Sequence, residues 1–137
     1  MAHATFPCEV LTPDGEAFAG AVEMISTRTT LGSIGILANH MPLLARLEPT
    51  ELRLYRSETD IVRFAQAEGF MQVSDNHALL LVGEIRSIEE LDREELEAAR
   101  EAAQAAREAA VAGSEAATRA DRELRRSEAF LRIIEGR

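Results

Sequence analysis

Apolar and polar residues alternate with a period of two over short stretches of the first 87 residues. In 5–12, for example, Phe6, Cys8 and Val10 share one face, and a turn follows at 12–15. Similar stretches lie at 21–29, 32–38, 51–56, 60–66, 69–73 and 77–82. The connections between them are short and contain turn-forming residues. Strands of this length and spacing, with no helical period between them, predict an antiparallel β-sandwich or barrel over residues 1–87.

The pattern changes after residue 87, where alanine, glutamate, arginine and leucine dominate. From 92 to 111 the chain contains no proline or glycine, which predicts a helix. Gly113 suits a helix C-cap and Ser114 an N-cap, so a second helix is expected from about 115 to 134. Because the turn between them is short, the two helices should lie antiparallel. The predicted fold class is α+β, with a β-sandwich domain at 1–87 and a helical hairpin at 88–137.

Small residues recur at steps of three and four along both predicted helices, which defines a seam where the helices face each other. Its members are Leu96, Ala99, Ala103, Ala106 and Ala110 on the first helix, and Ala117, Ala120, Leu124, Ser127, Leu131 and Ile134 on the second. Each buried CH₂ contributes only ~0.8 kcal/mol, so a seam rich in alanine is weakly held. The sequence therefore predicts a hairpin that can open or move.

Charge divides the chain along the same boundary. The net charge is -9 overall, about -5 for residues 1–87, -5 for 88–113 and +1 for 114–137. An acidic chain is not expected to bind nucleic acid, because neutralising phosphates needs a basic face. The last helix alone is not acidic, and its arginines, which are Arg119, Arg122, Arg125, Arg126 and Arg132, form a cationic side. Two interpretations stay open for that side, a solvated helix face and an arm that binds an acidic partner.

Residue types that carry chemistry are sparse. The three histidines are far apart and have no metal-ligand spacing, and no phosphate-binding loop or activated nucleophile is present. Cys8 alternates with apolar residues, which predicts a buried, unreactive thiol. The carboxylates near residue 92 fit a helix start better than an acid–base pair. We therefore expect a non-catalytic protein without a metal, a membrane span or a signal peptide.

One histidine, His40, interrupts an otherwise apolar run at 35–47. Pro42 restricts Met41 to extended geometry, which makes 39–41 a connection between strands. On the residues alone, His40 is interpreted as a capping or hydrogen-bonded loop histidine.

The segment 32–56, GSIGILANHMPLLARLEPTELRLYR, resembles the signature of the epsilon subunit of bacterial-type F-type rotary ATP synthases. The residues that carry the resemblance are Gly32, Gly35, Ile36, His40, Pro42, Leu43 and Leu44. Three other segments follow in the family's order: 18–26 resembles its second strand, 67–82 its late sheet hairpin, and 91–92 the start of its helical hairpin.

The resemblance implies a central-stalk subunit that couples proton-driven rotation of the c-subunit ring to the catalytic head through the gamma subunit. It would be a peripheral subunit at the cytoplasmic face of the bacterial plasma membrane. The implied interface with the c ring and gamma comprises Ser33, Gly35, Asn39, His40 and Pro42. Many family members carry an acid where this chain has Ser33, so a charge-based contact with the ring is not expected there.

For the hairpin, the resemblance implies a brake that extends into the alpha/beta head and blocks ATP hydrolysis. Arg122, Arg125 and Arg126 would then meet an acidic segment of the beta subunits. Some members also bind ATP as a regulatory ligand, and a match in shifted register implies the residues Leu91, Asp92, Glu97 and Arg100. No other cofactor is expected. The alternative function is a non-catalytic adaptor whose hairpin is a fixed coiled-coil spacer.

Overall fold

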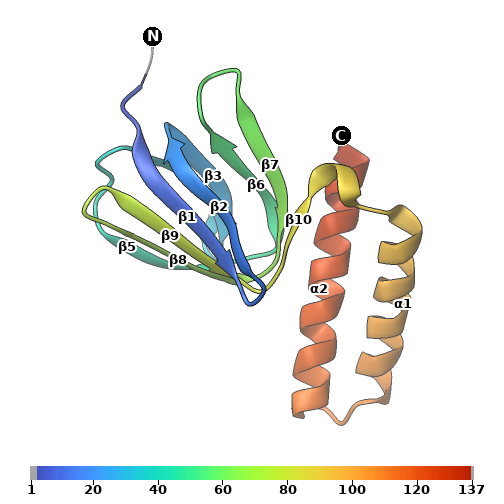
Figure 1. Ribbon diagram of the computed structural model, residues 1–137. Coiled ribbons are helices and arrows are strands. Elements are labelled where there is room, and N and C mark those ends of the chain that lie inside the picture. The colour runs from blue at the N-terminus through green and yellow to red at the C-terminus, as the bar shows by residue number, and fades with distance from the viewer. Residues whose placement is uncertain (1–2, 137) are drawn as a thin grey trace. The chain divides into compact units, whose positions relative to one another are not determined.

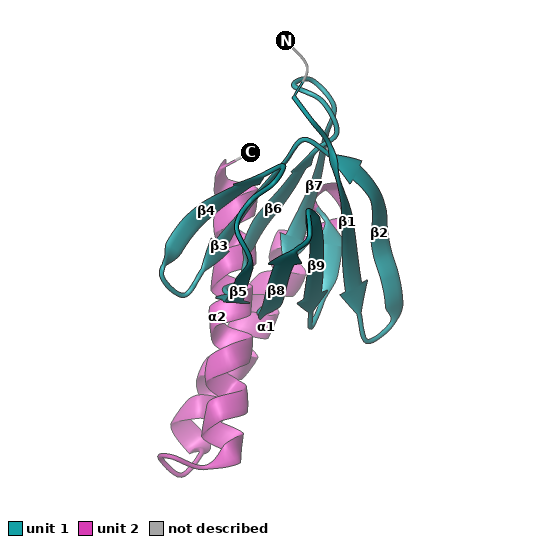
Figure 2. Cartoon of the chain, turned by 90° about the vertical axis from the view of Figure 1, so that its left-hand side faces the viewer, with its two compact units in different colours: residues 1–87 teal, residues 88–137 magenta. Residues whose placement is uncertain are grey.

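The computed structural model describes residues 3–136. The chain divides into two compact units, and the boundary in the sequence falls between residues 87 and 88 (Figure 2). The first unit is built from strands and the second from helices. This arrangement confirms the predicted α+β class, a sandwich followed by two contacting helices.

The strands of the first unit form one continuous hydrogen-bonded sheet that folds over on itself (Figure 1). They are β1 (Phe6–Thr12), β2 (Gly15–Val22), β3 (Met24–Thr29), β4 (Gly32–Leu37), β5 (Leu43–Leu47), β6 (Thr50–Tyr55), β7 (Ile61–Gln66), β8 (Gly69–Ser74), β9 (His77–Val82) and β10 (Ile85–Ser87). The strand order is β10-β7-β6-β3-β5-β8-β9-β1-β2, and β4 pairs with β3. The pairs are antiparallel except β1 with β9, which run parallel.

The fold in the sheet lies between β3 and β5, which pair only at Thr29 and Leu47. This corner separates a half formed by β10, β7, β6, β3 and β4 from a half formed by β5, β8, β9, β1 and β2. The inward side chains of both halves form one hydrophobic core, whose largest members are Phe6, Ile25, Ile36, Leu47, Leu52, Leu54, Met71 and Leu80. Fully burying a side chain of this size stabilises the fold by about 1.5–3 kcal/mol. The predicted inner face of β1, with Phe6, Cys8 and Val10, is confirmed.

One buried polar pair is satisfied inside the sandwich. The Thr27 hydroxyl donates to the Gln66 side-chain oxygen at 2.8 Å, and the Gln66 amide donates to the Glu48 carbonyl oxygen at 2.9 Å. Among the described residues, no buried side-chain nitrogen or oxygen lacks a hydrogen-bond partner. The core therefore contains no unpaired polar group that would call for a ligand.

The predicted strands agree with the structure except at one break and three omissions. Six of the seven predicted stretches match a strand to within one residue at each end. The prediction for 21–29 was wrong, because the chain breaks at Glu23 and most of that stretch is β3. β5, β10 and the first part of β2 were missed: β5 has apolar residues on both faces, and β2 exposes alanine and glycine. Neither strand shows the alternation by which a half-buried strand is recognised.

Two turns at the same end of the sandwich are built alike, between β1 and β2 and between β3 and β4. The hydroxyls of Thr12 and Thr29 each accept the N–H two residues further on, at 3.1 Å in both turns. The same hydroxyls donate to the carbonyl oxygens of Gly15 and Gly32, at 3.2 and 3.1 Å. Both glycines have positive φ, 123° and 127°, which other residues rarely adopt. The turns are therefore held in a fixed shape.

The second unit contains η1 (Ile88–Glu90), α1 (Arg93–Ala109) and α2 (Glu115–Gly136). Asp92 is the N-cap of α1, since its side chain accepts the N–H of Glu94 at 3.0 Å. Ser114 plays the predicted part for α2 and accepts the N–H of Ala117 at 3.2 Å. The prediction for Gly113 was wrong: Ala110 is the C-cap, and Gly113 lies in the turn with φ 81°. Glycine is needed there by the turn rather than by the end of the helix.

The seam between the helices is confirmed in part. Leu96 and Ala103 of α1 are buried, and so are Ala120, Leu124, Ser127 and Leu131 of α2. Ala99 and Ala106 are exposed instead, because a step of three residues along a helix places them about 60° to one side of the line through Leu96 and Ala103. Phe130 is also buried and was not predicted. The seam of α1 is thus narrower than the sequence indicated.

Candidate functional site

The loop between β4 and β5 holds the histidine that the sequence singled out. Asn39 has a positive φ of 63°, and its N–H donates to the side-chain oxygen of Asn76 at 2.6 Å, which ties this loop to the β8–β9 turn. The Nδ1 atom of His40 lies 2.7 Å from the Met41 carbonyl oxygen. A carbonyl oxygen only accepts, so Nδ1 donates and the ring braces its own loop. His40 is therefore a shape-holding residue, and Pro42 beside it is exposed.

The other candidate interface residues, Ser33 and Gly35, lie on β4 itself and are exposed. Ser33 is next to the β3–β4 turn, six residues before Asn39. β4 ends at Leu37, four residues after Ser33, and a strand rises about 3.3 Å per residue, so Ser33 lies about 13 Å from the end of β4 that leads into the His40 loop. The candidate interface therefore divides into two sites, and the structure does not bring Ser33 and His40 together.

The β3–β4 turn also presents a residue that sequence reasoning missed. Leu31 is 98% exposed at the tip of the turn that Thr29 and Gly32 hold in shape. Leu31 is therefore not part of the core and lies in solvent on a turn of fixed shape. The signal that could have found it is the Thr-x-x-Gly spacing, which occurs at 12–15 and again at 29–32.

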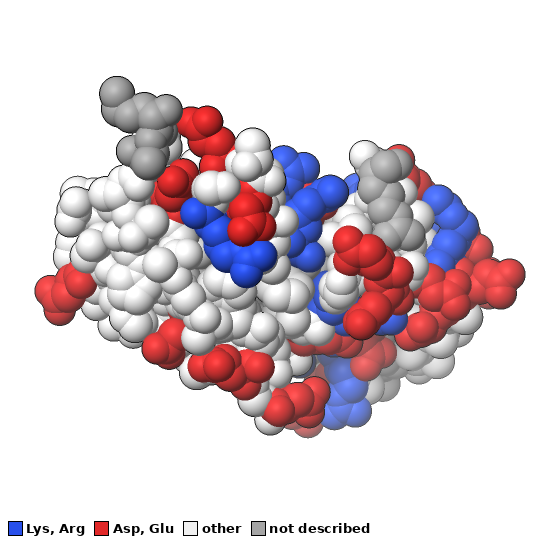
Figure 3. Space-filling model, turned by 45° about the horizontal axis from the view of Figure 1, so that its top comes forward, with Lys and Arg blue, Asp and Glu red and all other residues white. Residues whose placement is uncertain are grey.

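A larger apolar surface covers the outer side of β5, β8 and β9, and we call it the apolar face. It consists of Leu44, Phe70 and Leu81, whose exposed fractions are 74%, 49% and 48%. Phe70 and Leu81 are direct partners in the β8–β9 register. Figure 3 shows that the side of the sandwich drawn at the left is mostly free of charged residues. Leu44 lies on the same side of the sheet, opposite Gln72 in the β5–β8 register and diagonal to Phe70.

The apolar face has a cationic rim at Arg46. Its guanidinium carbon lies 5.8 Å from the centroid of the Phe70 ring, close enough for a cation–π interaction. An exposed contact of this kind is worth about 0.5–1 kcal/mol, so it favours one position of the Phe70 ring only weakly. No sequence motif predicted the apolar face. It forms because these strands carry apolar residues on both of their sides.

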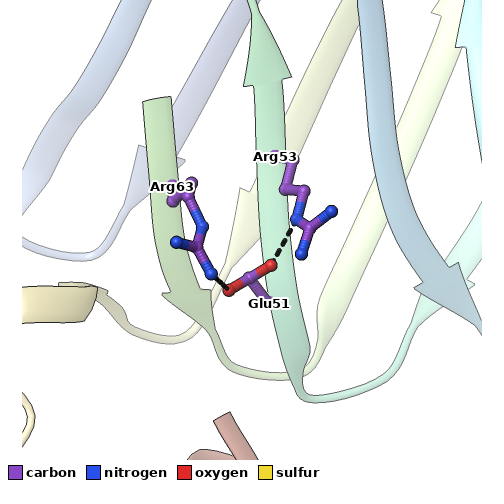
Figure 4. A network of polar contacts seen from close by, with 3 residues as sticks. All are labelled: Glu51, Arg53 and Arg63. Carbon is purple, nitrogen blue, oxygen red and sulfur yellow. Dashed lines mark hydrogen bonds and ion pairs between the residues drawn. The ribbon is translucent and has the colours of Figure 1, made fainter. Parts of the chain in front are cut away.

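The outer side of β6 and β7 has the opposite character. Arg53 and Arg63 are directly opposite each other in the register, and the carboxylate of Glu51 bridges both guanidinium groups (Figure 4). The hydrogen bond to Glu51, the largest cause, raises the pKa of Arg53. Two like charges in facing positions destabilise a sheet, and the shared carboxylate offsets this repulsion. Both arginines on this side are therefore already paired, with one carboxylate shared between two guanidinium groups.

The arginines of α2 lie away from the seam. At 100° per residue, Arg122 is on the side opposite Leu124, Ser127 and Leu131. Arg122 and Arg125 are exposed, whereas Arg126 is half-buried. The predicted cationic side of the last helix therefore reaches solvent at Arg122 and Arg125.

The residues of the implied ATP site lie at the start of α1. Leu91 is buried, and the Asp92 carboxylate is occupied as the helix cap. Glu97 is 3.9 Å from the Arg93 guanidinium, and Arg100 is half-buried. Among the described residues, no group of three or more His, Cys, Asp or Glu could hold a metal ion.

The single cysteine matches its prediction. Cys8 is fully buried, and burial, together with the nearby charge of Glu9, raises its pKa from 9.0 to about 12. A thiol reacts as its thiolate, so Cys8 is unreactive at neutral pH.

Comparisons with known proteins define the class of this β-sandwich. Residues 5–88 match the family described as "ATP synthase, Delta/Epsilon chain, beta-sandwich domain". Among named relatives, the ATP synthase epsilon chain of Persephonella marina is 39% identical over 89 residues, which is 65% of each chain. The epsilon chain of Bacillus subtilis is 34% identical over 96 residues, 69% of this chain and 71% of the relative.

Solved structures share the whole fold, hairpin included. A chain of the Euglena gracilis mitochondrial ATP synthase structure, described as OSCP/F1/c-ring, has a TM-score of 0.79 at 24% identity and covers 96% of this chain and 82% of its own. A chain of the Tetrahymena thermophila central stalk/c-ring structure has a TM-score of 0.57 at 19% identity, covering 99% and 98%.

The chain belongs to the ATP synthase epsilon chain family, as its resemblance implied. Epsilon chains are non-catalytic subunits of ATP synthase. The aligned part spans about two thirds of the Persephonella marina relative. Within residues 3–136, no helix is long and apolar enough to cross a membrane.

Proposed function

We propose that the chain is a central-stalk subunit of a proton-driven rotary ATP synthase, whose sandwich binds the gamma subunit and the c-subunit ring and whose hairpin regulates ATP hydrolysis. Membership of the epsilon chain family supports this role. The single observation that carries it is the apolar face, an exposed surface that a stalk partner would cover.

The apolar face is assigned to gamma. Leu44, Phe70 and Leu81 offer large apolar area on adjacent strands, and burying such side chains is worth about 1.5–3 kcal/mol each. The outer side of β6 and β7 is a poorer candidate, because its arginines are already paired with Glu51. The loop with Asn39, His40 and Pro42 leads directly into β5, so it borders the same partner.

The β3–β4 turn is assigned to the c-subunit ring. Leu31 lies at its tip and Ser33 follows it on β4, near the end of the strand away from the His40 loop. Because Ser33 and Leu31 are both uncharged, the contact would be apolar and hydrogen-bonded rather than ionic. Gly35, between the two ends on β4, would let the partner approach the backbone closely.

The hairpin is assigned the role of a brake that enters the alpha/beta head. Arg122, Arg125 and Arg126 would then contact an acidic segment of the beta subunits. Replacing all three with alanine should weaken inhibition of ATP hydrolysis in a salt-dependent way, whereas lysine at the same positions keeps the charge and should keep most of the inhibition. Unchanged inhibition in the alanine variant would refute the acidic contact.

A regulatory ATP site in the hairpin is the weaker part of the proposal. Arg100, the basic residue of the implied site, is half-buried on α1. The Asp92 carboxylate, however, would have to leave its cap to take part. Calorimetric titration of the full chain with ATP tests the site, and a flat trace would dismiss it.

Reconstitution separates the stalk subunit from the alternative, an adaptor with a fixed coiled-coil spacer. The full chain and a variant ending at Asp92 are added to the cognate catalytic head with gamma, and ATP hydrolysis is measured. The brake predicts inhibition by the full chain alone, and the adaptor predicts no difference. If the full chain fails to bind the head and gamma at all, the synthase role is refuted. In a cell the same complex would place the chain at the cytoplasmic face of the bacterial plasma membrane.

A further inference from the structure

Two ion pairs join the helices of the hairpin at positions far apart along it. Near the turn, the Arg107 guanidinium lies 3.3 Å from the Asp121 carboxylate. At the other end, the Arg93 guanidinium lies 3.8 Å from the Glu135 carboxylate. In both pairs the arginine comes from α1 and the acid from α2. The two pairs are separated by fourteen residues on each helix.

A third pair of opposite charges lies halfway between them. Arg100 is seven residues from both arginines, and Glu128 is seven residues from both acids. Seven residues make two helical turns, so each set of three lies along one side of its helix. The antiparallel register places Arg100 across from Glu128. Both are half-buried, and among the described residues neither has a side-chain partner.

The apolar seam is small, so these charges contribute a large share of the contact between the two helices. On α1 it buries only Leu96 and Ala103, and α2 contributes a serine, Ser127, to its middle. Alanine and serine offer little apolar area, so the seam alone defines the register of the helices poorly. Sliding one helix by a single turn would preserve small-residue contacts but would bring the arginines out of line with the acids.

We propose that the hairpin carries an arginine–carboxylate ladder of three rungs, Arg93–Glu135, Arg100–Glu128 and Arg107–Asp121, which sets the register of the closed hairpin and makes its opening sensitive to ionic strength. All three arginines of α1 belong to the ladder. Its charges are partly exposed, so salt screens them, and each rung favours the closed state about two- to fivefold. The ladder stands on the geometry of the hairpin, whereas its regulatory meaning rests on the proposed function.

Charge swaps in the full chain test the middle rung. Spin labels are attached at Ala98→Cys and Arg132→Cys, far from the turn, while buried Cys8 stays unlabelled. Arg100→Glu and Glu128→Arg should each raise the open fraction several-fold, and the double swap Arg100→Glu/Glu128→Arg should restore it. Raising NaCl from 50 to 500 mM should open the native hairpin but not a variant with glutamine at Arg93, Arg100 and Arg107.

Matched controls separate facing charges from net charge. Glu101→Arg and Arg119→Glu make the same changes in total charge at exposed positions away from the ladder and should leave the distances unchanged. The ladder is refuted if the single swaps have no effect or if the double swap fails to restore closure. Inhibition of ATP hydrolysis is measured on the same variants: if the hairpin opens as expected and inhibition does not change, the brake is refuted and the ladder is kept.

Discussion

Truncating one leucine of the apolar face, Leu44→Ala, should weaken binding of the gamma subunit without affecting the fold. The substitution removes three carbon atoms, worth about 2.4 kcal/mol when they are buried. Because 74% of Leu44 is exposed in the free chain, about 1.8 kcal/mol of this depends on the partner covering it. At 1.4 kcal/mol per tenfold change, the dissociation constant should rise about 20-fold.

The assay is titration of labelled chain with the cognate gamma subunit, followed by fluorescence anisotropy. Leu31→Ala is the matched control: it makes the same chemical change at a leucine that is 98% exposed, but on the turn at the other end of β4. It should leave gamma affinity unchanged, and both variants should unfold at the native urea concentration. Equal losses from the two substitutions, or no loss from Leu44→Ala, would refute the assignment of the apolar face to gamma.

Three further predictions concern stability. Gly69→Ala should lower the free energy of unfolding in urea by about 3 kcal/mol, because the new Cβ would lie 2.1 Å from the Leu81 carbonyl oxygen. In the control Gly20→Ala the Cβ would lie 3.5 Å from a Phe18 ring atom, and the loss should be under about 1 kcal/mol. Similar losses in the two variants would contradict the clash. Glu51→Gln should lower the free energy of unfolding by about 1 kcal/mol at low salt, because Arg53 and Arg63 then repel each other. The exposed control Asp60→Asn should lower it by less than about 0.5 kcal/mol. Equal losses would contradict a stabilising role of the shared carboxylate. The pKa of Cys8 is about 12 in the folded chain and 9.0 in the unfolded chain, so above pH 9 the unfolded chain loses the thiol proton first and stability falls. Relative to Cys8→Ala, the free energy of unfolding should fall by about 1.4 kcal/mol between pH 8 and 10. Parallel pH profiles of the two proteins would contradict this.

The fold could be predicted from the sequence wherever one side of a strand or helix is buried and the other side is exposed to solvent. β1 shows Phe6, Cys8 and Val10 at a period of two, and α1 has no residue that breaks a helix. The method failed at β5, because Leu44 is apolar although it is 74% exposed, so the strand lacks the alternation of polar and apolar residues. A residue kept apolar for a partner looks to the sequence like one kept apolar for the core.

The candidate site was harder to predict from the sequence than the fold. Ser33 and His40 lie seven positions apart in the sequence, and their closeness along the chain suggested one surface. β4 runs from Gly32 to Leu37, so the chain is carried along the strand from Ser33 before the His40 loop begins, and the two residues lie toward different ends of β4. Seven residues span only about 10 Å along a helix but about 23 Å along a strand, so residues near each other in sequence are separated most in a strand.

In the proposed function the two units would bind by different means, and their surfaces fit that difference. The apolar face has few charges besides Arg46, so its contact should persist at high salt, as a permanent attachment to a rotating stalk requires. The hairpin is held by a narrow seam and by partly exposed ion pairs, which are individually worth little. A contact of that kind can be exchanged for another of similar strength. The same chain can therefore stay bound through its sandwich while its hairpin trades pairing within itself for pairing with a partner.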